Sequence, residues 1–243
     1  MWFGGDASRI PFTMFTENHW IVISVFLFVL LAMYLLRNKL STRVNRRFEI
    51  GIALSLILFE IAFQLWIIIT GKWDVSFALP LDLSSISVML VIILLLTHHH
   101  SVFEIVFLVG IAGALQAVFT PVLSFDFPHF RFFHFFYSHI LVIWTVFYFR
   151  WYKGFNISLF SIAKAMVFLN VLFPFIYALN IIVGGNYWFL MRKPTGGSLL
   201  DFLGTHPWYI LGMEVTAILF FFLLWLVFAE KGKFVKHEKS FKE

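Results

Sequence analysis

Residues 79–97, LPLDLSSISVMLVIILLLT, place a polar start around Asp82 and Ser84 in front of an apolar run. Apolar runs of about 18 or more residues recur along the chain, and each can cross about 30 Å of hydrocarbon as a helix. The runs do not alternate polar and apolar residues, as strands of a membrane β-barrel would. The sequence therefore predicts an all-α, polytopic membrane protein.

The composition excludes several classes of function. The 243 residues are 61% hydrophobic and only 13% charged, far from the composition of a soluble domain. The chain has no cysteine, which removes disulfides, thiolate metal sites and cysteine nucleophiles. The net charge of +5 comes without a basic groove interleaved with aromatic residues, so nucleic-acid binding is not predicted.

Seven transmembrane helices are expected from the apolar runs and the residues that interrupt them. They cover about residues 19–36, 48–70, 82–97, 102–120, 133–149, 158–183 and 207–229. The first is expected to be retained, because no basic segment precedes it and no small-residue cleavage site follows it. Residues 1–229 are predicted to form one transmembrane domain, and residues 230–243 a basic cytoplasmic tail.

The distribution of Lys and Arg predicts the orientation. Counted over alternate connectors, one side of the membrane collects twelve of these residues and the other only five, with Lys164 inside a span. Because cytoplasmic loops carry the excess of positive charge, the N-terminus is expected outside and the C-terminus in the cytoplasm.

Polar residues inside the expected spans are not scattered evenly. An ionisable group at membrane depth costs on the order of 2.5 to 3.5 kcal/mol on insertion scales, so each one needs a partner or a wet cavity. Glu60 and Asn170 fall near mid-depth. Those predicted in the outer halves of the helices are Gln64, Asp82, Ser84, Ser85, Gln116, His134, His139, Tyr177, Asn180 and Glu214. A cavity open toward the outer leaflet explains the shared level, whereas helix association through separate hydrogen bonds is the alternative.

The histidines constrain the chemistry. His134 and His139 are five residues apart, about 140° around a helix, so one is expected to be functional and the other supporting. No His pair has the i, i+4 spacing of a zinc helix, and no metal or cofactor is predicted, although Asp82, a histidine and Glu60 or Glu214 could combine. Residues 98–100, three histidines, are expected to form a solvated cytoplasmic turn.

Asp82 and Ser84 allow two interpretations. Asp82 can cap the helix that follows, and Ser84 can bond back to a carbonyl one turn earlier. With a histidine at the same depth they instead suit covalent catalysis, in which a base takes the hydroxyl proton and the oxygen attacks an acyl carbonyl. Arg131, Arg192 and Lys193 could hold a lipid phosphate beside them.

Six segments carry a resemblance to known proteins: residues 79–84, 130–139, 186–190, 193–194, 198–201 and 207–209. With them, nearly the whole chain resembles the bacterial YwaF-type integral membrane family. It is more distantly similar to the vertebrate transmembrane acyltransferase that acylates ether phospholipids and to the androgen-induced hydrolases of fatty-acid esters. The resemblance implies a bacterial plasma-membrane protein, with the nucleophile position on Ser84 and the histidine on His139, or else His134. In the bacterial pattern His and Cys commonly stand where Asp82 and Ser84 stand here.

The favoured hypothesis is an acyltransferase or lipid ester hydrolase that acts on a phospholipid or fatty-acyl lipid in the membrane. Its catalytic candidates are Ser84, His139, His134 and Asp82, and its substrate-binding candidates are Arg131, Lys193, Gln64, Gln116, Asn180, Tyr187, Glu60 and Glu214. A transporter or lipid-binding protein that uses the same cavity is the alternative, and a structural or assembly partner is a third possibility.

Overall fold

The computed structural model describes residues 2–40, 46–194 and 199–229. Within these ranges every regular element is a helix, and a single β-bridge joins Pro11 to Phe125. The predicted all-α class is therefore confirmed for the described part of the chain. The predicted tail, residues 230–243, lies outside the described residues.

The described helices follow the expected runs, with ends that differ by a few residues. The long ones are α1 (Glu17–Leu40), α2 (Arg46–Ile69), α3 (Leu83–Thr97), α6 (Phe130–Tyr152), α7 (Leu159–Val183) and α8 (Trp208–Phe228). Between α3 and α6, α4 (His100–Ile105), the π-helix η2 (Val106–Gly110) and α5 (Ile111–Phe119) form one continuous apolar run. The short 3-10 helices are η1 (Ala7–Arg9), η3 (Tyr187–Phe189) and η4 (Leu199–Leu203).

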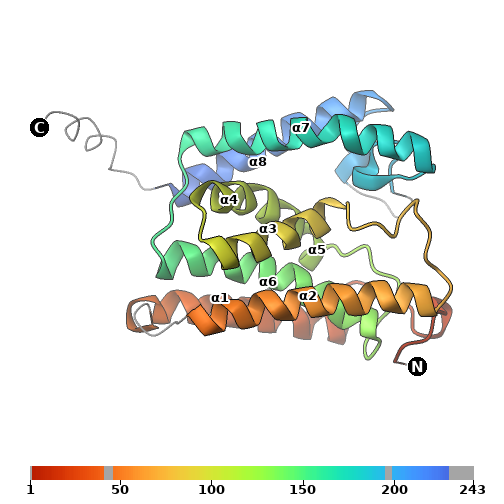
Figure 1. The fold of residues 1–243 in the computed structure, drawn as a ribbon, viewed down its shortest axis with the longest axis horizontal. Helices are drawn as coiled ribbons and strands as arrows, with labels where there is room; N and C mark the ends of the chain where they lie inside the picture. Colours follow the sequence, from red (N-terminus) through yellow and green to blue (C-terminus); the bar gives the residue numbers. More distant parts are fainter. Residues whose placement is uncertain (1, 41–45, 195–198, 230–243) are drawn as a thin grey trace, which may run out of the picture.

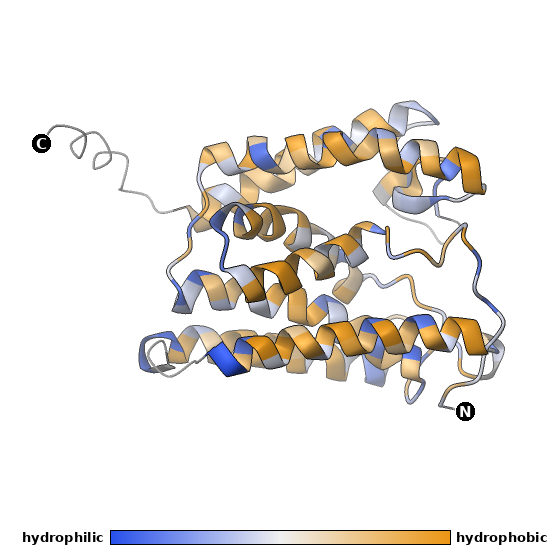
Figure 2. Cartoon of the chain, viewed as in Figure 1, coloured by the Kyte–Doolittle hydropathy of each residue, from blue (hydrophilic) through white to orange (hydrophobic). Residues whose placement is uncertain are grey.

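Six helical segments are long and apolar enough to cross a membrane, and α3 with 15 residues is shorter. The protein is thus a multi-pass membrane protein. The helices lie side by side along one axis, with α1 and α2 on one side, α7 and α8 on the other, and α3 to α6 between them (Figure 1). Hydrophilic residues gather toward the two ends of the bundle (Figure 2). The number of crossings and their orientation stay predictions.

The α6 helix is the centre of the bundle. Of the residues in its most apolar stretch, 72% are buried, against 11% for α7 and for α8. The main hydrophobic cluster contains residues of every long helix, such as Phe26, Leu56, Val91, Phe107, Phe149, Ala165 and Phe221. Groups on α6 are therefore held more rigidly than groups on the outer pair α7 and α8.

A fully buried carboxylate, that of Glu49 on α2, ties three helices together at one end of the bundle. It lies 3.1 Å from Arg46, 2.7 Å from the Lys153 ammonium and 2.6 Å from His98 Nε2, and it accepts a hydrogen bond of 2.5 Å from the Tyr148 hydroxyl. Arg46 also donates to the last carbonyls of α3, those of Leu95 and Leu96. The C-terminal end of α3 is consequently fixed to α2 and α6.

A second buried carboxylate, that of Glu104 on α4, fixes α7. It accepts a hydrogen bond of 2.6 Å from the Ser161 hydroxyl, forms an ion pair with Lys164 and lies 3.5 Å from His100 Nδ1. In the turn expected at residues 98–100, His99 and His100 are exposed, as a solvated turn predicts. His98 is half-buried, and its ring contacts the buried carboxylate of Glu49. The expectation rests on composition alone, which does not reveal that partner.

The short length of α3 has a structural consequence at its other end. Fifteen residues rise only about 22 Å, whereas the hydrocarbon layer is about 30 Å thick. Because the C-terminal end of α3 is held by Arg46 and Glu49, we expect its N-terminal end to fall short of the opposite surface. The polar residues that begin α3 are then predicted to lie below that surface.

The segment before α1 folds over the ends of α2 and α6. Trp66 Nε1 donates to the Phe3 carbonyl at 3.0 Å, and the Phe130 amide donates to the Trp2 carbonyl at 2.8 Å. His129 caps α6, where its Nδ1 accepts from the Arg131 amide at 3.1 Å and its Nε2 donates to the Gly4 carbonyl at 2.9 Å. Burial lowers the pKa of His129, in keeping with a neutral ring that makes both bonds.

The Glu49 network makes a prediction for stability. Glu49→Gln removes the negative charge and leaves Arg46 and Lys153 without their buried counter-charge. Breaking such a buried pair costs about 3 to 5 kcal/mol, so the melting temperature in detergent should fall markedly. Glu17→Gln, at an exposed glutamate that opens α1, is the matched control and should leave it unchanged. Equal melting temperatures for the two variants would contradict a structural role for Glu49.

Candidate functional site

Arg131, in the first turn of α6, is the common neighbour of three elements. Its Nη1 donates to His134 Nδ1 at 2.8 Å, and its guanidinium lies over the Phe63 ring, 4.5 Å from the centroid. It also interacts electrostatically with Glu60 on α2 and with Asp82 at the start of α3. A planar, always charged side chain suits such a position, because it can stack on an aromatic ring and pair with carboxylates together.

Glu60 is one of the residues around Arg131, which together with Phe63, Asp82 and His134 form the Arg131 cluster. Its carboxylate lies 3.5 Å from His134 Nε2 and accepts a long hydrogen bond of 3.4 Å from Gln64, which also donates to the Ala78 carbonyl at 3.0 Å. Glu60 and Gln64, four residues apart, therefore lie on the same face of α2. Phe63 stacks on His134 with ring centroids 4.4 Å apart, so aromatic packing holds the imidazole in place.

The two candidate histidines differ in which nitrogen is free. His134 Nδ1 accepts from Arg131, which places its proton on Nε2, toward Glu60. His139 Nδ1 lies 2.6 Å from the Phe135 carbonyl, so this nitrogen must be the donor. His139 Nε2 has no hydrogen-bond partner within the described ranges and keeps its lone pair available. His134 Nε2 faces Glu60 at 3.5 Å without forming a hydrogen bond in the described structure, so the two histidines differ in which nitrogen has a partner and in which nitrogen keeps a free lone pair.

Ser84 lies at about the same level as His139. A Cβ added at Gly110 would be 3.8 Å from Ser87 Cβ and 3.0 Å from Val142 Cγ1, so Ser87 and Val142 flank one point. The helices α3 and α6 run in the same direction (Figure 1). Ser84 precedes Ser87 by three residues on α3, and His139 precedes Val142 by three residues on α6. Ser84 and His139 therefore lie at the same depth to within about one helical turn.

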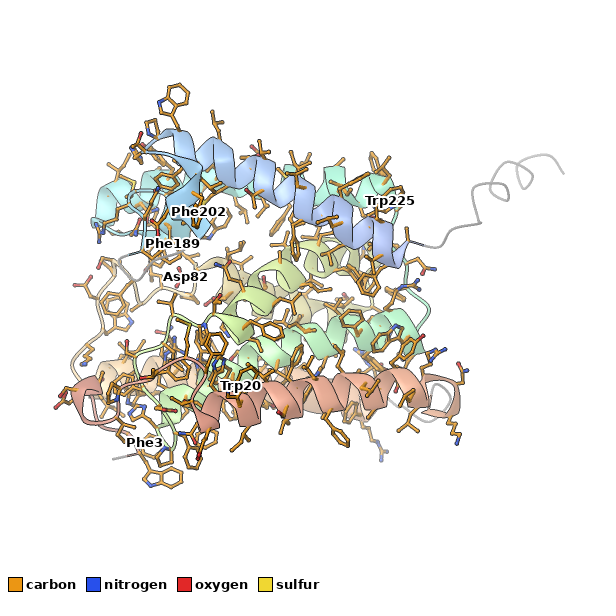
Figure 3. All side chains as sticks on the ribbon, turned by 180° about the vertical axis from the view of Figure 1, so that it is seen from behind. Phe3, Trp20, Asp82, Phe189, Phe202 and Trp225 are labelled. Carbon is orange, nitrogen blue, oxygen red and sulfur yellow. The ribbon has the colours of Figure 1, made fainter. Side chains whose placement is uncertain are left out.

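Two polar side chains at the start of α3, Asp82 and Ser84, make no hydrogen bond to the residues that the structure describes. Ser87 donates to the Leu83 carbonyl at 2.8 Å, but the Ser84 hydroxyl makes no hydrogen bond to any residue that the structure describes. Asp82 takes the N-cap position, yet its carboxylate accepts no capping bond. The expectation that Asp82 caps α3 is thus met in position only. Figure 3 places Asp82 at the same end of the bundle as Phe189 and Phe202, with Trp225 toward the other end.

Other predicted substrate-binding residues have different partners. Asn180 and Tyr187 bind backbone groups of the loops near α3. Glu214 on α8 accepts from Asn170 on α7 at 3.2 Å. Lys193 lies 5.5 Å from the centroid of the Tyr209 ring. Gln116 is exposed on α5.

One feature of the site was not predictable in this detail. The stacking of Phe63 on His134 had no signal beyond the many phenylalanines of the chain. Within the described ranges, no three His, Asp or Glu side chains are grouped so that they could hold a metal ion. The side chains of the site offer a hydroxyl, imidazoles, carboxylates and a guanidinium.

These observations define a polytopic, all-α membrane protein with a polar cluster near one end of its bundle. A family model, that of the TMEM164 family, matches residues 14–225, and the chain belongs to this family. A comparison with curated proteins and a comparison with solved structures both find no match.

The hydrogen bonds of the histidines predict their tautomers. His134 should carry its proton on Nε2 and His139 on Nδ1, because the first accepts from Arg131 and the second donates to Phe135. The ¹⁵N shifts of histidine-labelled protein in lipid, assigned through His134→Gln and His139→Gln, report this directly. A proton on Nε2 of His139 would contradict this assignment, because Nε2 would then have no free lone pair.

Proposed function

We propose that the protein transfers or hydrolyses acyl groups of membrane lipids, with Ser84 as nucleophile and His139 as general base. One observation carries the proposal: a hydroxyl and an imidazole nitrogen, both without a protein partner in the described ranges, lie at about the same depth on neighbouring helices. A nucleophile beside a base whose other nitrogen is fixed is the arrangement that covalent acyl transfer requires. Lipid esters are the substrates that the surrounding bilayer supplies.

The chemistry balances with these two residues. His139 Nε2 takes the proton from the Ser84 hydroxyl while the oxygen attacks the ester carbonyl. The carbon–oxygen bond to the leaving alcohol breaks, and that alcohol takes the proton from His139. Attack on the acyl-serine by a second lipid alcohol completes a transfer, whereas attack by water completes a hydrolysis.

Neighbouring groups would support each stage. The first amides of α3 have no intrahelical acceptor, so those at Ser84 and Ser85 are available to stabilise negative charge on the substrate carbonyl. Arg131 would attract an anionic headgroup and orient Asp82, while Glu60 and His134 hold Arg131 in place. Lys193 would contact the headgroup from the loop after α7.

The substrate class and the membrane are also part of the proposal. The resemblance to bacterial YwaF-type proteins and to an ether-phospholipid acyltransferase supports a lipid substrate and a place in the bacterial plasma membrane. The distribution of Lys and Arg supports a site beneath the outer surface.

Removing either reactive group should abolish turnover. Ser84→Ala and His139→Ala should each lower the release or transfer of a labelled fatty acid from phospholipid in nanodiscs by on the order of 10³-fold or more, as expected for a nucleophile and its base. Ser87→Ala, on the same helix with its hydroxyl bonded to Leu83, should keep activity within about threefold.

Unchanged turnover in both Ser84→Ala and His139→Ala would contradict the assignment. Lipid that is bound by the wild type but never cleaved would instead favour the transporter or binding-protein alternative.

A further inference from the structure

The loop before α3 is held by side chains from the segment that follows α7. The Tyr187 hydroxyl accepts from the Leu79 amide at 3.0 Å and donates to the Val75 carbonyl at 2.8 Å. The Trp188 indole N–H donates to the Leu81 carbonyl at 2.8 Å. Three backbone groups of residues 75–81 thus bind two adjacent side chains, and this loop leads directly into Asp82 and Ser84.

Tyr187 is itself fixed in place. It is 2% exposed, its amide donates to Asn180 Oδ1 at 2.7 Å and its carbonyl accepts from Asn180 Nδ2 at 2.9 Å. Gly185 lies so close to the loop that a Cβ there would be 2.8 Å from the Ser76 carbonyl oxygen. A side chain at position 185 would therefore push the two segments apart.

The backbone at residues 188–189 is unusual. Trp188 and Phe189 both adopt left-handed φ values, 59° and 54°, which are uncommon for residues other than glycine. The Tyr209 hydroxyl of α8 donates to the Phe189 carbonyl at 2.5 Å. A strained segment persists only where its surroundings hold it, and here α7 supplies Asn180 while α8 supplies Tyr209.

We propose that Tyr187 and Trp188 are positioning residues that set the place of Ser84 by fixing the backbone of residues 75–81. This inference rests on the proposed function, and it gives Tyr187 and Asn180 a role other than substrate binding. Their polar groups already bind the protein backbone, so they act on the reaction through the loop. The pair α7 and α8, which is the least buried part of the bundle, thereby controls the start of α3.

Tyr187→Phe tests the proposal because it removes both hydroxyl bonds and keeps the ring. Tyr152→Phe is the matched control, since its hydroxyl donates to a backbone carbonyl, that of Met33, at 2.9 Å near the other end of the bundle. Trp188→Phe removes the bond to Leu81 as an independent variant. Amide hydrogen exchange of residues 75–86 in nanodiscs reports the loop, and the kinetics of lipid ester turnover report Ser84.

We expect faster exchange at residues 75–86 in Tyr187→Phe and Trp188→Phe, and wild-type exchange in Tyr152→Phe. Turnover in the first two should show kcat reduced about 10-fold to 100-fold with KM within about twofold, because a small misplacement of a reacting atom mainly affects the chemical step.

Wild-type exchange in both test variants would overturn the proposal, as would faster exchange with unchanged kcat. A wild-type protein without any ester turnover would contradict the proposed function alone, because the exchange comparison would still decide whether Tyr187 and Trp188 hold the loop.

Discussion

The fixed end of α3 is the constraint on which the arrangement of the site depends. Arg46 binds the last carbonyls of this helix, and the buried carboxylate of Glu49 binds Arg46, His98 and Lys153. A helix of 15 residues is shorter than the hydrocarbon layer is thick, so we expect its other end to lie below the opposite surface. At that end Asp82 is exposed and Ser84 is half-buried, on the side of the bundle where α3 packs beside α6 and where the Arg131 cluster lies.

Buried polar groups at the two ends of the bundle differ in how completely they are satisfied. Glu49 and Glu104 each have several charged or hydrogen-bonding partners, as expected of groups that stabilise helix packing. At the other end, the buried His134 Nε2 makes no hydrogen bond, and the half-buried Ser84 hydroxyl and His139 Nε2 also lack a protein partner within the described ranges. Polar groups left open at membrane depth are costly, and they are retained where a substrate or water can bind them.

The helices could be predicted well from the sequence, because long apolar runs and a few polar interruptions have little alternative in a membrane. The sequence also predicts that Gln64, Asp82 and His134 share one level, since depth follows from position along each helix. Glu60 is expected near mid-depth, and its approach to His134 was not predicted. The partners of Glu49 and Glu104 could not be predicted, because these contacts join residues far apart in the chain. The difference between His134 and His139 depends on single hydrogen bonds, which helical spacing does not determine.

The proposed mechanism requires that α3 and α6 lie close together at Ser84 and His139, and cross-linking in membranes tests this closeness most directly. The chain has no cysteine, so Ser84→Cys with His139→Cys creates one defined pair. A protease site placed in the loop between α5 and α6 makes a short bis-thiol-reactive cross-link visible on a gel. The account predicts that this pair cross-links readily, whereas Ser84→Cys with Thr145→Cys, about 9 Å deeper on α6, does not. Cross-linking of the deeper pair alone would contradict it.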